Sequence, residues 1–350
     1  MMSPPRSLAA LSLIAFFFAL SSSREAVVFA PEEGSALTKT FGMEGVFELE
    51  ELSVVVDGED MAEALGSFEV TVDAVTSIVV TDTYAALGEG RPRKLVRSFD
   101  RLGASSTLTT DSDVGGESEE TRLSSALEGE TVVFTLDEET AGYTVAFAPG
   151  EGDEELLEEL EEEMDLRFLL PGGEVAVGDT WEVPVRAFSR LLLPGGTLGW
   201  TAEDEPEAFG GTMEGFGDAL FAKLDELLAG ECTCTFKGTT AGIAVIEIHL
   251  EVGSALDVSE LLRDLAEDAA AKAGQELPIE IEVADLNLDV EAQGVLRWNT
   301  TAGHLQDFEL SSDGLLGIDL ALSGEIMGEA LAAEITVEVS TSMKHTVGVE

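Results

Sequence analysis

The sequence predicts an α+β protein in which a long, strongly curled antiparallel β-sheet, shaped like a half-barrel, packs against two or three amphipathic helices. Three observations favour this fold class. Apolar and polar residues alternate over long stretches, two or three segments instead show helical periodicity, and glycine-bearing turns separate the segments. With 350 residues and 45% hydrophobic content, the chain is long enough to enclose a large core.

Strands are expected in both halves of the chain. Phe68, Val70 and Val72 alternate with polar residues, which is typical of a strand with one face in water. The segment 109–120 is polar and glycine-bearing, so we expect a loop there. The predicted strands cover 43–57, 66–82, 130–136, 142–148, 231–237, 242–252, 279–298, 304–312, 315–326 and 331–348.

Helices are expected over 153–166, 213–228 and 257–273. In the first, Leu157, Leu160 and Met164 fall on one stripe and acidic residues fill the rest. No lysine lies four residues from these acids to relieve their repulsion, so only packing of the stripe could hold the helix.

The chain divides into four expected parts. Residues 1–23 are predicted to be a signal peptide, because Arg6 precedes the apolar run Leu8–Leu20; cleavage after Ala30 is the alternative. A β-rich half with the acidic helix (24–168) and an α+β half (201–350) follow, joined by a hinge at 169–200. A short match between 97–108 and 297–310 raises the option of two related halves.

The formal charge of -52, from 70 acidic and 18 basic residues, excludes a nucleic-acid partner because phosphate would be repelled. We expect an exported, periplasmic or secreted protein without a transmembrane anchor in its mature form. Its oligomeric state is left open. The segment 88–103 holds five of the basic residues, either to bind an anion or, the favoured interpretation, to pair with neighbouring acids.

No catalytic residue, metal site or cofactor is predicted, and the chain is not expected to be an enzyme. Cys232 and Cys234 are interpreted as buried strand residues, with a strained bridge or intermolecular pairing left open. Asp111, Asp113 and Gly116 resemble the start of a calcium loop, but Arg122 stands at the twelfth position, where an acid is needed. His249, His304 and His345 lie far apart and in no catalytic motif.

The favoured function is non-catalytic binding of a lipid-like or apolar small molecule in a cavity of the sheet. The alternative is an acidic cell-surface structural or interaction protein that gathers divalent cations. The candidate cavity-lining residues, for which ordinary core packing is the competing interpretation, are Phe68, Val70, Val72, Phe134, Phe147, Leu220, Leu224, Leu261 and Leu265.

One pattern supports a family resemblance. The G-x-L-x-W-N-x-x-x-G-x-L motif at 294–305 is similar to hairpins of uncharacterised exported bacterial proteins. The order of the elements resembles the half-barrel of periplasmic lipoprotein carriers and related lipid-binding envelope lipoproteins. The resemblance implies a lipid-binding half-barrel, covers about residues 40–350 in element order alone, and carries over no functional residue. The lipid-anchor cysteine of many such proteins has no counterpart here.

Overall fold

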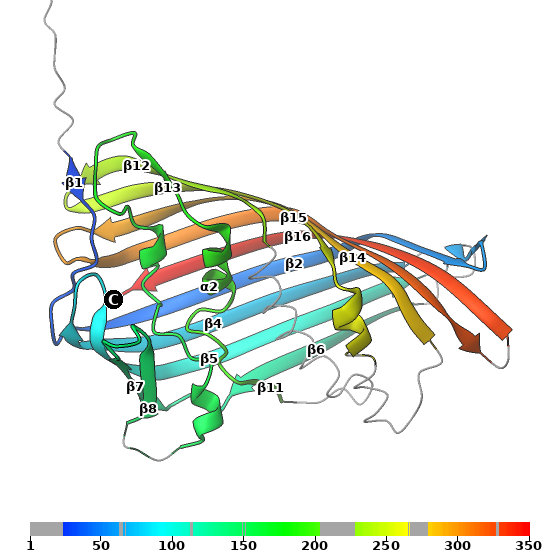
Figure 1. Ribbon diagram of the computed structural model, residues 1–350, viewed down its shortest axis with the longest axis horizontal. Coiled ribbons are helices and arrows are strands. Elements are labelled where there is room, and N and C mark those ends of the chain that lie inside the picture. The colour runs from blue at the N-terminus through cyan, green and yellow to red at the C-terminus, as the bar shows by residue number, and fades with distance from the viewer. Residues whose placement is uncertain are drawn as a thin grey trace, which may run out of the picture.

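The computed structural model describes residues 24–62, 66, 68–112, 115–148, 150, 152–203, 228–264, 266, 279–326 and 329–350. It is dominated by one large antiparallel sheet (Figure 1). Strands account for 67% of the described residues and helices for 8%, so the expected α+β class is wrong and the described part of the protein is mostly β. The sheet does not close on itself.

The high strand content comes from the long strands, several of which exceed 20 residues. They are β2 (Ala36–Val56), β4 (Phe68–Leu87), β5 (Pro92–Ser112), β6 (Gly115–Ser125), β12 (Gly230–Thr240), β13 (Ile243–Asp257), β14 (Ile279–Asn299), β15 (His304–Ile326) and β16 (Glu329–Val349). The short strands are β1 (Glu25–Ala26), β3 (Glu59–Asp60), β7 (Thr131–Leu136), β8 (Tyr143–Phe147), β9 (Glu174–Val175), β10 (Thr180–Glu182) and β11 (Trp200–Ala202).

Strands from both halves of the chain form the same sheet. Its order is β10-β12-β13-β14-β15-β16-β2-β4-β5-β6-β11, and the hairpin β7–β8 attaches to β5. The last long strand, β16, pairs along most of its length with the first, β2. The expected parts 24–168 and 201–350 therefore meet at the centre of one sheet.

Residues 152–203, called the cap below, lie across one face of this sheet. From the middle of the cap β10 pairs with β12, and near its C-terminal end β11 pairs with β6, so the cap is joined to both edges of the sheet. In Figure 1 the green cap segments cover one end of the long strands, which run on beyond them. We call the side that the cap covers the inner face, and the strand ends beyond the cap the distal half.

A short helical turn replaces the first of the long helices that the sequence predicts. The expected helix over 153–166 is a single 3-10 turn, η1 (Glu154–Leu157), followed by irregular chain. Its unrelieved acidic repulsion disfavours a helix, whereas Leu157, Leu160 and Met164 are still buried. The cap's other turns are η2 (Arg167–Leu169), η3 (Val185–Phe188) and α2 (Ser189–Leu192).

The two later helix predictions reach only partly into the described residues. Most of the segment 213–228 lies outside them. In 257–273, β13 continues to Asp257 and residues 259–264 are helical, while 267–273 lie outside the described residues.

Three smaller expectations are also wrong. Residues of the predicted loop 109–120 belong to the paired strands β5 and β6, and the two separate strands expected at 304–312 and 315–326 are one strand, β15. A side chain at Gly314 would meet the backbone of Asp289 across the strands, which explains a glycine there. The match between 97–108 and 297–310 is not structural, since the first lies within β5 and the second spans the β14–β15 turn.

The N-terminal segment of the described chain belongs to the core. Val27 and Phe29 are buried, the indole nitrogen of Trp298 donates to the carbonyl of Val28 at 3.1 Å, and the Ala30 amide donates to Gly303 at 2.8 Å. Cleavage after Ala30 would remove these contacts. The predicted signal peptide itself lies outside the described residues. No helix in the described ranges is long and apolar enough to cross a membrane.

The outer face carries two rows of directly opposed carboxylates across β13, β14 and β15. One row places Asp285 between Asp257 and Asp319. The other places Glu291 between Glu251 and Asp313. Like charges at opposed positions destabilise a sheet, and salt screens them, so these rows should make stability depend on ionic strength.

We therefore expect Asp285→Asn to raise the free energy of unfolding by about 0.5–1 kcal/mol at low salt and by less in about 1 M salt, where screening is strong. Chemical denaturation at both salt concentrations measures this. Asp73→Asn is the matched control, because Asp73 faces Val46 and Thr107 instead of acids. Equal stabilisation by both variants would contradict the row argument.

Candidate functional site

The inner side of β16 changes character where the cap ends. Under the cap, Val347 and His345 are buried. Further along, the inner positions are apolar without interruption from Val339 to Leu331, and all of them are half-buried. The outer positions between them are polar or small, including Glu334 and Glu338. Strict alternation of apolar and polar residues over this length indicates one apolar face and one solvent-exposed face of the strand.

The neighbouring strands continue this apolar surface. Register places Leu316 and Ile318 of β15 on one side of Val339 and Val337, and Leu49 and Leu52 of β2 on the other. We call the set the distal apolar surface. Its members are Leu316, Ile318, Leu320 and Leu322 of β15; Leu331, Ala333, Ile335, Val337 and Val339 of β16; Phe47, Leu49, Leu52, Val54 and Val56 of β2; and Phe68, Val70 and Val72 of β4.

The two ends of the inner face are covered to different extents. Beneath the cap, core side chains such as Val80, Phe99 and Leu296 have no exposed area. On the β15 side of the distal apolar surface, Val258 and Leu262 pack over the strands. Among the described residues, neither core cluster includes the distal side chains of β16, β2 and β4.

The predicted cavity-lining residues separate into groups. Phe68, Val70 and Val72 lie together on the distal apolar surface. Phe134 and Phe147 instead belong to the capped core. Leu261 is buried on the helical turn 259–264. The remaining three, Leu220, Leu224 and Leu265, lie outside the described residues.

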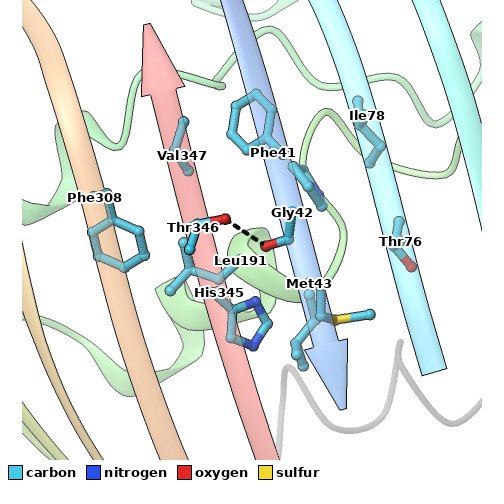
Figure 2. Close-up of a pocket in the computed structure, with 12 residues that line it drawn as sticks. Phe41, Gly42, Met43, Thr76, Ile78, Leu191, Phe308, His345, Thr346 and Val347 are labelled. Carbon is cyan, nitrogen blue, oxygen red and sulfur yellow. Dashed lines mark hydrogen bonds between the residues drawn. The ribbon is translucent and has the colours of Figure 1, made fainter. Parts of the chain in front are cut away.

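A small cavity of about 20 Å³ lies between the cap and the strands (Figure 2). Leu191 of α2 covers it, and Phe41, Ile78 and Phe308 contribute apolar walls. His345 lies at its edge beside Met43, as Figure 2 shows, and is 6% exposed. A pocket of this volume can hold about one water-sized group.

A buried cluster of charged side chains fixes the cap to the sheet. Arg97 of β5 binds Asp82 of β4 through two bonds, from Nε at 2.7 Å and from Nη2 at 2.9 Å. Lys39 of β2 lies 2.7 Å from both Asp82 and the cap residue Asp165. The hydroxyl of Tyr84 donates to Asp165 at 2.6 Å. All four charged side chains have no exposed area.

The cap contributes further partners to this cluster. Arg97 also donates to the carbonyls of Glu161 and Glu162, at 2.9 and 2.8 Å. Arg167 pairs with Glu162 at 2.6 Å and with Glu163 at 2.5 Å. Three cations thus face four carboxylates, and Oδ2 of Asp165 and Oε1 of Glu162 accept no hydrogen bond from the described residues. Arg97 therefore pairs with neighbouring acids, as the favoured interpretation of the basic segment 88–103 expected.

Burial and pairing shift the pKa values of these groups. Burial by itself would raise the pKa of Asp82, but Arg97 and Lys39 outweigh it and hold the pKa at about 2. Burial would lower the pKa of Lys39, yet the charges of Asp165 and Asp82 raise it. For Glu162, burial dominates over Arg167 and raises the pKa. The cluster is therefore held by ionised pairs with an excess of buried carboxylate.

Other chemically capable residues do not assemble into a site. Cys232 and Cys234 are free and buried on β12. His249 pairs with Glu251 on the exposed outer face, and His304 contacts the carbonyl of Leu305. In the described ranges, no group of three or more His, Cys, Asp or Glu side chains is arranged to hold a metal ion. Among the described residues, the distal apolar surface is the best candidate.

Breaking the buried Arg97–Asp82 pair should destabilise the folded protein. We expect Arg97→Met to lower the free energy of unfolding by about 3–5 kcal/mol, because it leaves Asp82 buried with less compensating charge. The double variant Asp82→Leu/Arg97→Met leaves the neutral pair Lys39–Asp165 and should lose less than the sum of the two single variants. Urea denaturation of all four proteins measures this coupling. Additive losses would show that the pair is not coupled.

His345 should make the protein sensitive to mild acid. Burial lowers its pKa from 6.5 to about 4. Between these values the unfolded chain binds the proton and the folded chain does not, so stability falls as the pH falls from about 6.5 to about 4. The loss should approach about 3 kcal/mol. Loss through Asp82 follows only at lower pH, between about 4 and 2.

Melting curves between pH 7 and pH 4 measure this dependence. His345→Leu should flatten the decline in that range, whereas His249→Leu, which changes an exposed histidine, should leave it unchanged. An unaltered decline in His345→Leu would assign the acid sensitivity to other groups.

No protein-family model matches the sequence, and no curated protein matches it. Among solved structures, an outer membrane channel from Pseudomonas putida F1 is 9% identical with a TM-score of 0.21, over 92% of this chain and 97% of that one. The secretin domain β-barrel of a Salmonella injectisome is 7% identical with a TM-score of 0.17, over 90% of this chain and 62% of that one. At such scores neither likeness establishes a shared fold, and neither shows a lipoprotein-carrier family.

Proposed function

We propose that this chain is an exported, non-catalytic binding protein that holds a lipid-like apolar ligand along the distal apolar surface. The observation that carries the proposal is the uninterrupted apolar alternation of β16 beyond the cap, matched on β15, β2 and β4. The formal charge of -52 shows that this chain has many charged side chains that could cover a surface in contact with water. Apolar residues concentrated on one side of its longest strands therefore favour a specific use of that side.

The dimensions of the surface suit a chain-shaped ligand. From Leu331 to Val339 the strand spans about 27 Å, and the four strands β15, β16, β2 and β4 span about 14 Å. The product, roughly 400 Å², lies in the range of the largest apolar patches on soluble proteins, which are often functional. Burying about ten methylene groups there would contribute about 8 kcal/mol, which corresponds to micromolar affinity.

A charge placed on the distal apolar surface should abolish this binding. We expect the purified protein to take up the neutral dye Nile red and Val337→Lys to bind it at least about tenfold more weakly, because the ligand would have to desolvate the ammonium group. Fluorescence titration measures both affinities, and native mass spectrometry detects any co-purified lipid.

The matched control is Ser342→Lys, which adds the same charge to the same strand but on the exposed outer side. It should bind the dye like the unaltered protein. Absence of dye uptake and of co-purified lipid in the unaltered protein would refute the proposal. Equal weakening by both lysines would refute the assignment to the inner face.

A further inference from the structure

Glu162 of the cap is a buried carboxylate with one oxygen left without a partner. Its side chain is 4% exposed, and its Oε2 accepts a hydrogen bond from Arg167 at 2.6 Å. Its Oε1 accepts no hydrogen bond from the described residues. Arg167 is also paired with Glu163, so one guanidinium group faces two carboxylates. A buried charge with incomplete pairing costs free energy, and binding of a proton would relieve this cost.

Asp165 also has an oxygen without a partner, but its charge is better compensated. Its Oδ1 lies 2.7 Å from Lys39 and accepts the hydroxyl of Tyr84 at 2.6 Å. Both contacts favour the ionised form of Asp165. Burial raises the pKa of Glu162 against the opposing charge of Arg167. Among the carboxylates of the cluster, Glu162 therefore gains most from a proton.

Tyr143 of β8 offers an acceptor for this proton. Burial first, and then the charge of Glu162 and a hydrogen-bonding contact with it, raise the pKa of Tyr143, so the two side chains lie within reach of each other. The Tyr143 hydroxyl donates its one hydrogen to the carbonyl of Pro92 at 2.6 Å. Its oxygen is then left to accept a hydrogen bond from Glu162, and a carboxyl group donates only when it is protonated.

The other charged and titratable groups around this position already have partners. They are Lys39 of β2, Asp82 and Tyr84 of β4, Arg97 of β5, Arg91 beside the Tyr143 ring, and Glu163, Asp165 and Arg167 of the cap. A hydrogen bond from a protonated Glu162 to Tyr143 would therefore add a contact without replacing an existing one.

We propose that Glu162 binds a proton in mild acid, before the other carboxyl groups of the cluster, and then donates a hydrogen bond to Tyr143. This bond joins the cap to the β7–β8 hairpin, so the docking of the cap tightens as the pH falls. The cap thus contains a pH-sensitive contact that is independent of the proposed ligand.

The effect of Glu162 is opposite in sign to that of His345. A raised pKa in the folded protein contributes stability that is fully present below the ordinary value of 4.5 and is lost as the pH rises through the folded value. Burial lowers the pKa of His345, which therefore loses stability as the pH falls. The two groups compensate each other in part between neutral and mildly acidic pH.

Urea denaturation of Glu162→Gln tests the inference, because the amide can donate to Tyr143 without carrying a charge. The denaturation midpoint should lie above that of the unaltered protein at pH 8, and the difference should disappear near pH 4.5, the ordinary pKa of glutamate. The matched control is Glu163→Gln, because Glu163 accepts from Arg167 and from the Asp165 amide as a carboxylate. This control should lower the midpoint at pH 8. An equal decrease in Glu162→Gln would overturn the inference.

Infrared spectra detect the proton directly, because a protonated carboxyl group has a carbonyl stretch that a carboxylate lacks. The difference between the unaltered protein and Glu162→Gln should show this band at a higher pH than the remaining carboxyl groups. Tyr143→Phe, which removes the acceptor, should make the band appear only at lower pH.

Two infrared and salt results would contradict the proposal. One is a difference band that appears only together with those of the other carboxyl groups. The other is stabilisation by sodium or calcium ions at constant ionic strength that Glu162→Gln abolishes, since a metal ion would then occupy the position assigned to the proton.

Discussion

The buried ion cluster is the interaction on which the arrangement of this protein depends. Lys39 of β2 and Arg97 of β5 lie on either side of β4, and they hold Asp82 of the sheet and Asp165 of the cap where neither carboxylate is exposed. Removing such groups from water is costly, so the cluster is stable only when the cap supplies its carboxylate and carbonyl partners. The cap therefore has one well-defined docking position, which the pairing of β10 and β11 with the sheet reinforces.

This docking divides one continuous sheet into two environments. At the capped end the inner face is a closed core, where aromatic and aliphatic side chains lose all exposure. In the distal half the same strands, with the same alternation, present half-buried apolar side chains. The small cavity with His345 lies at the boundary. One sheet can thus carry a closed core at one end and half-buried apolar side chains at the other without interrupting its strands.

The sequence predicts the strands better than the tertiary arrangement. Period-two alternation correctly identifies the strands that contain Phe68 and Ile246, since side chains on opposite sides of a sheet differ in exposure. It cannot show that the stripe of Leu157 and Leu160 packs from an irregular cap, because tertiary contacts override helical propensity there. The sequence does contain one sign of these residues. Arg97 is a charged residue at an inward-facing strand position between Leu95 and Phe99, and His345 is a polar residue at such a position between Met343 and Val347. Which partners such residues meet depends on strands distant in sequence.

The pairing of β16 with β2 has a consequence for biosynthesis. Ser340 donates a hydrogen bond to Glu50 from a position 290 residues later in the chain. The centre of the sheet therefore joins segments that lie far apart in the sequence, and such distant pairing makes folding slow. A product truncated before residue 329 would expose the backbone edges of both β15 and β2, which are sites for aggregation.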